Sequence, residues 1–316
     1  NIVHIVLARL PGAPEGTKGI SLFIVPKFNV KEGGANGERN TVQCGSIEHK
    51  MGIKASATCV LNFDNAKGFL IGPENRGLNC MFTSLSGPKN PEKEADPIIV
   101  HPDVRRMLLT QKAFAEGGRA LCYYLCTLAD IIDLSKDEKE VKKADDLMAF
   151  ITPIAKAFLT ESGLEAASYG MQVYGGHGFI SEWGMEQIVR DARISTLYEG
   201  TTGIQSLDLL GRKVLLTQGQ LLRNFTGLIE TFCKENAENE AIKELTTKLA
   251  SLNAEWVEMT MKVGMAAMQN QDEVGGASVD YLMYSGYVTL AFIWAKMALV
   301  ASNKLAEGSD EKGFYT

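Results

Sequence analysis

The spacing of apolar residues changes near Glu74, and this change constrains the fold more than any other feature of the chain. Before it, residues 2–10 and 20–28 are short runs rich in Val, Ile and Phe, joined by a turn containing Pro and Gly, as is typical of β-strands. We expect the first run to be a buried strand, residues 58–64 to be another strand, and residues 31–40 to be a flexible surface loop. After Glu74 the apolar residues recur at helical spacing, which predicts a mainly α-helical chain that begins with a β region.

The helical part begins with a long predicted helix over residues 104–134. Residues 136–146 mix charges of both signs, which predicts a solvated loop and a helix start. The Thr-Pro pair at 152–153 predicts the beginning of the next helix, because a hydroxyl can cap it and Pro is tolerated in its first turn. The Gly-Gly pair at 175–176 is expected to end that helix after Tyr174. Further helices are predicted over residues 182–193, from Thr202 onward, and over residues 221–232, 245–268 and 281–305.

The last of these helices is apolar on nearly all sides and long enough to approach a membrane span. Lys296 and the polar side chains of Ser285 and Thr289 argue against a membrane, so a buried or interface helix is the better interpretation. Tyr284, Val288, Ile293 and Met297 lie on faces that cannot all point toward one core. We therefore expect neighbouring helices or another subunit to cover this helix.

Composition excludes several classes of function. The chain has 316 residues and a net charge of −6, so a nucleic-acid partner is not expected. The six cysteines are single, without a Cys-x-x-Cys pair, which favours reduced thiols in a reducing compartment such as the cytoplasm. The four histidines are scattered, and we predict no metal. Because the chain has no initiating Met or signal peptide and begins within a strand-like run, we expect it to be part of a longer protein.

Two stretches carry the chemistry-bearing residues. In the first, Gly175 and Gly176 either end a helix or let backbone N–H groups approach a phosphate or a ring. In the second, Glu199 either projects from a linker between two helices into a cleft, or is a first-turn acid of a helix capped by Thr202. From the residues alone both alternatives stay open for each stretch.

Taken together, these stretches resemble the acyl-CoA dehydrogenases, and the resemblance covers roughly residues 1–212. It is carried by Gln-Val-Tyr-Gly-Gly-His-Gly at 172–178, Arg-Asp-Ala-Arg at 190–193 and Tyr-Glu-Gly-Thr at 198–201, in this order and spacing. Residues 48–54, 60–66 and 70–78 resemble segments of the family's β domain. The helices after residue 212 resemble the extension of a bacterial subgroup that acts on thioesters such as 3-(methylthio)propanoyl-CoA.

The resemblance implies a fold and an activity. The expected fold is a partial β-barrel domain over residues 1–73, an up-and-down four-helix bundle with the FAD and catalytic motifs over 74–212, and a helical extension over 213–316. The implied activity is α,β-dehydrogenation of an acyl-CoA thioester, with a hydride passing to FAD and electrons then passing to an electron-transferring flavoprotein. Alternatives are an acyl-CoA oxidase, an FAD-binding relative of the alkylation-response type, and a non-catalytic helical assembly module.

The resemblance also implies residue roles. Glu199 is the expected base for the α-proton, its N–H is a donor to the thioester oxygen, and Gly200 lines the thioester pocket. Thr201, Thr202 and Gly203 are expected to contact FAD, and Gly203 stands where the family usually has Gln. The segment at the end of the preceding helix is expected to contact the FAD of a neighbouring subunit, which implies a homodimer or larger assembly. That segment consists of Gln172, Val173, Tyr174, Gly175 and Gly176.

The chain departs from the family pattern in two ways. It lacks the helical N-terminal domain and the first β-strands. It also joins Thr83 directly to Ser84, where the family has a further long helix that supplies an Arg to the FAD pyrophosphate. Because a bundle without one helix would contain a large void, we expect that residues are omitted at this junction rather than deleted.

Overall fold

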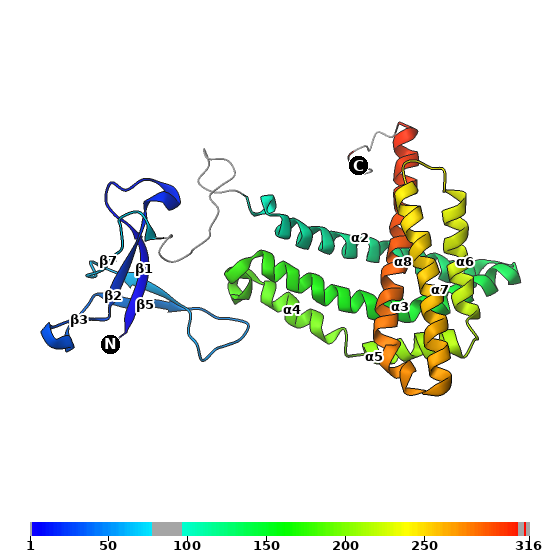
Figure 1. Cartoon of the computed structure of the whole chain (residues 1–316), viewed down its shortest axis with the longest axis horizontal. Coiled ribbons are helices and arrows are strands. Elements are labelled where there is room, and N and C mark those ends of the chain that lie inside the picture. The colour runs from blue at the N-terminus through cyan, green and yellow to red at the C-terminus, as the bar shows by residue number, and fades with distance from the viewer. Residues whose placement is uncertain (1, 78–96, 309–312, 314–316) are drawn as a thin grey trace. The chain divides into compact units, whose positions relative to one another are not determined.

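The computed structural model describes residues 2–77, 97–308 and 313, and the Thr83–Ser84 junction lies outside them (Figure 1). The chain forms two compact units. Unit 1 comprises Asn1–Arg106 and Gly176–Glu186, and unit 2 comprises Met107–Gly175 and Gln187–Thr316. The three domains expected from the sequence stay a prediction. The two units are defined by contacts between residues, whereas the three domains were defined by sequence motifs.

Unit 1 contains small antiparallel sheets rather than a closed barrel. Strands β1 (Val3–Arg9), β2 (Ile20–Pro26) and β7 (Phe69–Ile71) form one sheet in the order β1-β2-β7. Strand β3 (Phe28–Val30) pairs with β4 (Asn36–Arg39), and β5 (Val42–Ile47) pairs with β6 (Cys59–Phe63). In the described residues no strand of one sheet pairs with a strand of another. The expected partial barrel is therefore represented by three separate sheets.

Two sequence expectations in unit 1 are wrong. Residues 31–40 are not a plain loop, because strand pairing between Val30 and Asn36 turns them into a hairpin with a short 3-10 turn at Glu32–Gly34. Strand β1 is not buried: Ile5 is 64% exposed. The reason is that β1 lies at the edge of its sheet and has only β2 as a neighbour there.

Residues 176–186 belong to unit 1 through backbone pairing with a distant segment. Lys50 and Ile180 form an antiparallel bridge, and the N–H of Met51 donates to the carbonyl of Phe179 over 3.0 Å. The His177 ring packs edge-on against Trp183, with centroids 5.1 Å apart. The segment contains the 3-10 turn η5 (Ser181–Trp183) and all but the first residue of the 3-10 turn η4 (Gly175–Phe179). Elsewhere in unit 1, the 3-10 turn η1 (Gly16–Gly19) precedes β2, and the 3-10 turn η3 (Ile98–Val100) precedes the first long helix.

Unit 2 is helical. Its elements in chain order are α2 (Pro102–Leu134), α3 (Glu138–Val173), α4 (Met185–Ile194), α5 (Thr202–Leu207), the π-helical segment η6 (Asp208–Leu215), α6 (Gln220–Glu235), α7 (Lys243–Gln269) and α8 (Asp272–Ala306); the first residues of α2 and α4 belong to unit 1. Helix α7 packs against both α6 and α8, and α3 packs against α6 and α8 (Figure 1). The chain is therefore mainly helical with small β-sheets, as its apolar spacing predicts.

Helix α3 begins earlier than the Thr-Pro pair predicts. Asp137 is its N-cap, and the Asp137 carboxylate accepts from the N–H of Lys139 over 2.9 Å. Pro153 lies inside the helix and is buried, although Pro has no N–H to donate to the preceding turn. Thr152 next to it donates its hydroxyl to the carbonyl of Met148 over 2.7 Å. Packing of this helix in the core, rather than local propensity, carries it through the proline.

One hydrophobic core holds unit 2 together. It joins residues from α2, α3, η6 and the three C-terminal helices, among them Leu121, Phe158, Leu210, Phe225 and Trp256, which are all fully buried. The rings of Phe150, Phe225 and Trp256 are mutual neighbours, with centroids 5.7 to 6.1 Å apart. The helices after residue 212 are therefore part of the same core as those before it.

Helices α3 and α8 are long and apolar enough to cross a membrane by length and composition alone. Both contribute buried side chains to the core, with 50% of the most apolar window buried in α3 and 44% in α8. Both are therefore core helices. The prediction that α8 is covered by its neighbours holds in part: Val288 and Ile293 are buried, Tyr284 and Met297 are partly buried, and Tyr287 is 50% exposed.

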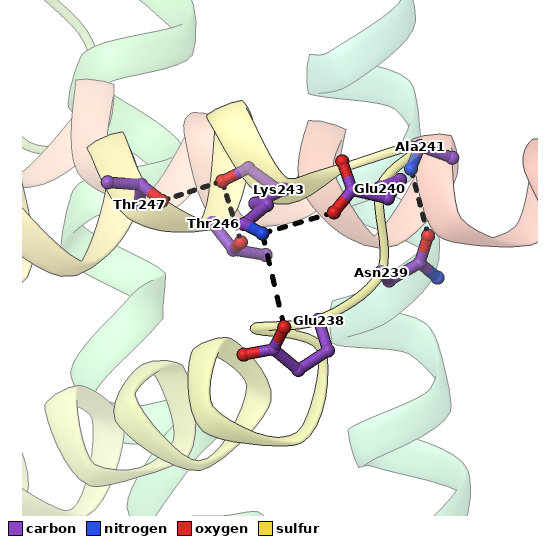
Figure 2. A network of polar contacts seen from close by, with 7 residues as sticks. All are labelled: Glu238, Asn239, Glu240, Ala241, Lys243, Thr246 and Thr247. Atoms are coloured by element: carbon purple, nitrogen blue, oxygen red, sulfur yellow. Dashed lines mark hydrogen bonds and ion pairs between the residues drawn. The ribbon is translucent and has the colours of Figure 1, made fainter.

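The turn between α6 and α7 is closed by polar contacts (Figure 2). The ammonium of Lys243 lies 3.1 Å from Glu240 Oε1 and 3.9 Å from Glu238 Oε2. The hydroxyls of Thr246 and Thr247 donate to the Lys243 carbonyl over 3.0 and 2.8 Å. Thr246 is buried, but Glu238, Glu240 and Lys243 are exposed at the surface, where ion pairs contribute little to stability. The hydrophobic core therefore stabilises the fold more than these contacts do.

Candidate active site

Glu199 lies on the connection between α4 and α5. Helix α4 ends at Ile194, whose carbonyl accepts from the N–H groups of Leu197 over 2.9 Å and Tyr198 over 3.2 Å. These bonds fold the chain into a tight turn directly before Glu199. The Glu199 side chain is exposed, so its carboxylate is available to a ligand.

Both residues at the tip of this connection have left-handed backbone conformations. Glu199 has φ +51° and Gly200 has φ +91°. A non-glycine residue in this region carries backbone strain, which persists only where surrounding contacts hold it. The left-handed conformation favours glycine at position 200, and a Cβ there would also lie 2.5 Å from Nε2 of Gln205, whose flexible side chain would have to move.

Lys156 of α3 supplies contacts that hold this connection, and it was missed in the sequence interpretation. Its Nζ donates to the carbonyls of Ser195 over 3.0 Å, Tyr198 over 3.0 Å and Gly200 over 2.7 Å. The available signal was that Lys156 is the one charged residue between Asp146 and Glu161, in a run that is otherwise mostly apolar.

The segment after Gly200 begins α5. Thr201 is the N-cap, and its hydroxyl accepts from the N–H of Ile204 over 3.3 Å. Thr202 is not the cap: its hydroxyl donates to Oε1 of Glu161 on α3 over 2.5 Å. Glu199 precedes the cap by two residues and so is not the first-turn acid of the alternative interpretation. The backbone at Gly203 is open, because a Cβ there would meet nothing closer than 4.0 Å.

The Gln172–Gly176 motif lies where α3 ends. The helix stops at Val173, Tyr174 is its C-cap, and Gly175 follows with φ +59°. Tyr174 is 49% exposed, and a Cβ on Gly175 or Gly176 would meet no atom within 4 Å. The motif therefore ends a helix and also leaves accessible backbone, so the two interpretations of its glycines are compatible.

Exposed apolar side chains flank Glu199 in the sequence. Leu197 and Tyr198 before it are 48% and 52% exposed, and Ile204 and Leu207 after it are 58% and 43% exposed. Neighbouring apolar side chains of this size at the surface are typical of a binding region. An open groove of about 660 Å³ between α6 and α7, lined by Thr226, Cys233 and Asn253 among others, does not include Glu199. Among the described residues no group of three or more His, Cys, Asp or Glu could hold a metal ion.

Comparison with known proteins identifies the family. Residues 79–215 match the family described as "Acyl-CoA dehydrogenase, C-terminal domain", and residues 225–316 match "Acetyl-CoA dehydrogenase C-terminal like". The chain belongs to the acyl-CoA dehydrogenase family. The first of these matches includes both the Gln172–Gly176 motif and Glu199, and the second covers most of α6 to α8.

Two curated acyl-CoA dehydrogenases align over nearly the whole chain. The 3-methylmercaptopropionyl-CoA dehydrogenase of Ruegeria pomeroyi is 39% identical over 98% of this chain and 58% of its own length. The "Broad-specificity linear acyl-CoA dehydrogenase FadE5" of Mycobacterium tuberculosis is 36% identical over all of this chain and 60% of its own length. The chain thus spans about 60% of the length of these relatives. The first alignment extends over 343 residues, more than the 316 of the chain, so the relative contains residues without a counterpart here.

A solved structure shows the same fold. Caenorhabditis elegans ACDH-11 in complex with C11-CoA is 20% identical and superposes with a TM-score of 0.53 over 94% of this chain and 52% of that one. The likeness supports an acyl-CoA dehydrogenase fold for the chain as a whole. The described strands nevertheless form three separate sheets and do not close into a barrel.

Proposed function

We propose that the full protein catalyses FAD-dependent α,β-dehydrogenation of an acyl-CoA thioester and that Glu199 is the base. The observation that carries this proposal is the exposed Glu199 carboxylate on a strained and anchored connection, beside the side-chain-free Gly200 and among exposed apolar residues. Membership of the acyl-CoA dehydrogenase family supports the reaction class.

The residues present fit an FAD molecule. Thr201, Thr202 and Gly203 begin α5, where backbone N–H groups lack helical partners and the surface at Gly203 is open. The accessible Gln172–Gly176 backbone supports a contact with the FAD of a neighbouring subunit, which makes a homodimer or larger assembly part of the proposal. When bound there, FAD would supply the acceptor for the hydride that leaves the substrate β-carbon.

The chain's own residues then have defined tasks. The α-proton of a thioester is weakly acidic, so the base must lie close to it while negative charge develops on the thioester oxygen. The Glu199 carboxylate takes this proton, and the Glu199 N–H donates to the oxygen. Gly200 leaves room for the thioester, and the exposed apolar side chains around Glu199 provide a surface for the acyl chain.

We further propose that the substrate is a short acyl-CoA thioester such as 3-(methylthio)propanoyl-CoA. The 39% identity to the Ruegeria pomeroyi protein supports it, while the 36% identity to the mycobacterial enzyme supports linear acyl-CoA substrates. The electron acceptor is an electron-transferring flavoprotein, and the location is the cytoplasm. A panel of acyl-CoA thioesters with a dye acceptor, run on the full-length protein, ranks the substrates.

Replacing Glu199 by Gln tests the base directly. Gln retains the shape of the side chain but accepts no proton, so the rate of anaerobic flavin reduction by acyl-CoA is expected to fall by ~10²–10⁴. The FAD content, read from the absorption spectrum, should match that of the parent protein. The exposed Glu235→Gln, at the end of α6, is the matched control and should retain the parent rate. An unchanged rate in Glu199→Gln would falsify the assignment.

A further inference from the structure

Lys156 occupies an unusual position for a lysine. It is only partly exposed, and its neighbours Ile154, Ala155, Ala157 and Phe158 are buried in the core of unit 2. Within the described residues its ammonium forms no ion pair, although most other lysines of α3 and α7 with assigned partners pair with carboxylates. An ammonium has three N–H donors, and here the three acceptors are backbone carbonyls of one short connection.

These carbonyls surround Glu199. The carbonyls of Tyr198 and Gly200 belong to the residues on either side of it, and that of Ser195 anchors the beginning of the turn. The peptide bonds of the described chain are trans. In a trans peptide the C=O and the following N–H point in opposite directions, so a carbonyl held by Lys156 directs the Glu199 N–H away from α3.

We propose that Lys156 is a positioning residue that orients the Glu199 N–H toward the thioester oxygen and holds the Glu199 carboxylate over the α-carbon. This inference rests on the proposed function. The Lys156 ammonium, which donates to the Tyr198 carbonyl, also polarises the peptide group that joins Tyr198 to Glu199. This polarisation makes the Glu199 N–H a stronger donor as the thioester oxygen becomes negative. The left-handed conformation of Glu199 is maintained by the same contacts, because they bind the chain on both sides of it.

A purely structural role predicts something different. If Lys156 only holds the connection to α3, its loss lowers the stability of the folded protein and reduces the affinity for all ligands by the same factor. If Lys156 orients the Glu199 N–H, its loss reduces the affinity only for ligands whose carbonyl oxygen accepts from that N–H. An acyl-CoA thioester and the corresponding S-alkyl-CoA thioether, which lacks the carbonyl oxygen, separate the two roles.

The experiment uses full-length holoenzyme with Lys156→Met, Lys156→Arg and the exposed control Lys143→Met on the same helix. Met retains the length of the side chain without donors or charge, and Arg restores both. The dissociation constants of one acyl-CoA and its thioether analogue are measured from the perturbation of the flavin spectrum. FAD content and thermal melting are recorded for each variant.

The parent protein and Lys143→Met are expected to bind the thioester more tightly than the thioether. In Lys156→Met this preference is expected to disappear, and flavin reduction to slow by on the order of 10²-fold, because small displacements of a reacting group cost that much. Lys156→Arg is expected to recover most of both. If Lys156→Met does not retain FAD, Lys156→Gln, which keeps a shorter uncharged donor, takes its place in the same comparison.

An unchanged preference for the thioester in Lys156→Met, or in Lys156→Gln where that variant replaces it, overturns the positioning role. Loss of affinity for both ligands by the same factor also overturns it and leaves a structural tie. The Glu199→Gln variant separates this failure from failure of the proposed function. If Glu199→Gln abolishes flavin reduction while Lys156→Met leaves the ligand preference intact, the base assignment stands and only the positioning role is wrong.

Discussion

At the scale of single residues, a pair of buried hydroxyl groups joins α7 to α8 in unit 2. Tyr281 of α8 is 2% exposed, and its hydroxyl lies 2.8 Å from that of Thr260 on α7. Burial raises the pKa of Tyr281 from its ordinary value of 10.0 to about 12. Lys296 shows the opposite shift, since desolvation lowers the pKa of its ammonium, which lies 4.8 Å from the centre of the Tyr124 ring.

The raised pKa of Tyr281 predicts a loss of stability at high pH. Below pH 10 the phenol is protonated in both the folded and the unfolded chain, so its contribution is fully present. Between pH 10 and about 12 only the unfolded chain ionises, which lowers the free energy of unfolding by about 2–3 kcal/mol. Tyr281→Phe should lack this loss and differ from the parent by about 1 kcal/mol at pH 7.

Urea unfolding at pH 7, 9, 10, 11 and 12 measures this difference. Thr260 keeps a partner in the variant, because its hydroxyl also lies 2.8 Å from the Trp256 carbonyl. If the free energy of unfolding falls equally with pH in the parent protein and in Tyr281→Phe up to pH 12, Tyr281 is not responsible for the loss of stability at high pH.

At the scale of secondary-structure elements, close approach of α3 and α8 depends on one glycine. A Cβ on Gly286 would lie 2.2 Å from two ring carbons of Phe158, which is fully buried. Gly276 lies in the same helix, and a Cβ there would meet nothing within 4 Å. The two glycines therefore differ in packing while sharing helical backbone conformation.

Substitution of these two glycines by Ala is expected to have opposite effects. Gly286→Ala forces Phe158 to move in a full core and should destabilise the protein by ~1–3 kcal/mol. Gly276→Ala should stabilise it by ~0.5–1 kcal/mol, because Ala loses less backbone freedom in a helix. Chemical denaturation of both variants measures the two changes, and equal shifts in the same direction would contradict the close helix contact.

At the scale of the whole molecule, the C-terminal helices are part of the fold rather than an appendage. Trp294 of α8 donates its Nε1–H to the Ala113 carbonyl of α2 over 3.1 Å. Phe150 of α3 contacts the rings of both Phe225 and Trp256. Removal of residues 213–316 therefore exposes buried apolar surface across α3.

The truncated chain 1–212 is expected to aggregate or to change its oligomer size. Exposed apolar surface of this extent drives association in water. Light scattering and size-exclusion chromatography compare it with the parent protein, and a deletion that begins after Glu307 is the control, since α8 ends at Ala306. A monodisperse truncated chain of unchanged oligomer size would show that α6 to α8 fold and assemble independently.

Local sequence chemistry determined most helices of this protein. The long helix over 104–134, the C-terminal helices and the glycine-terminated end of α3 each depend on residues within one or two turns of one another, so spacing and turn chemistry predict them. The motif around Glu199 likewise pointed to the family that the comparisons then showed. The roles of Glu199, Gly200 and the FAD-contacting residues remain predictions, because they depend on a ligand.

Only tertiary structure decided the remaining features. Helix α3 continues through Pro153 because its neighbours bury it, and β5 exists because β6 offers it a partner with Val42 opposite Phe63. The contacts of Lys156 join residues 39, 42 and 44 positions apart in the chain. No spacing rule spans such distances, because these contacts form only when packing of the core brings α3 and the Glu199 connection together.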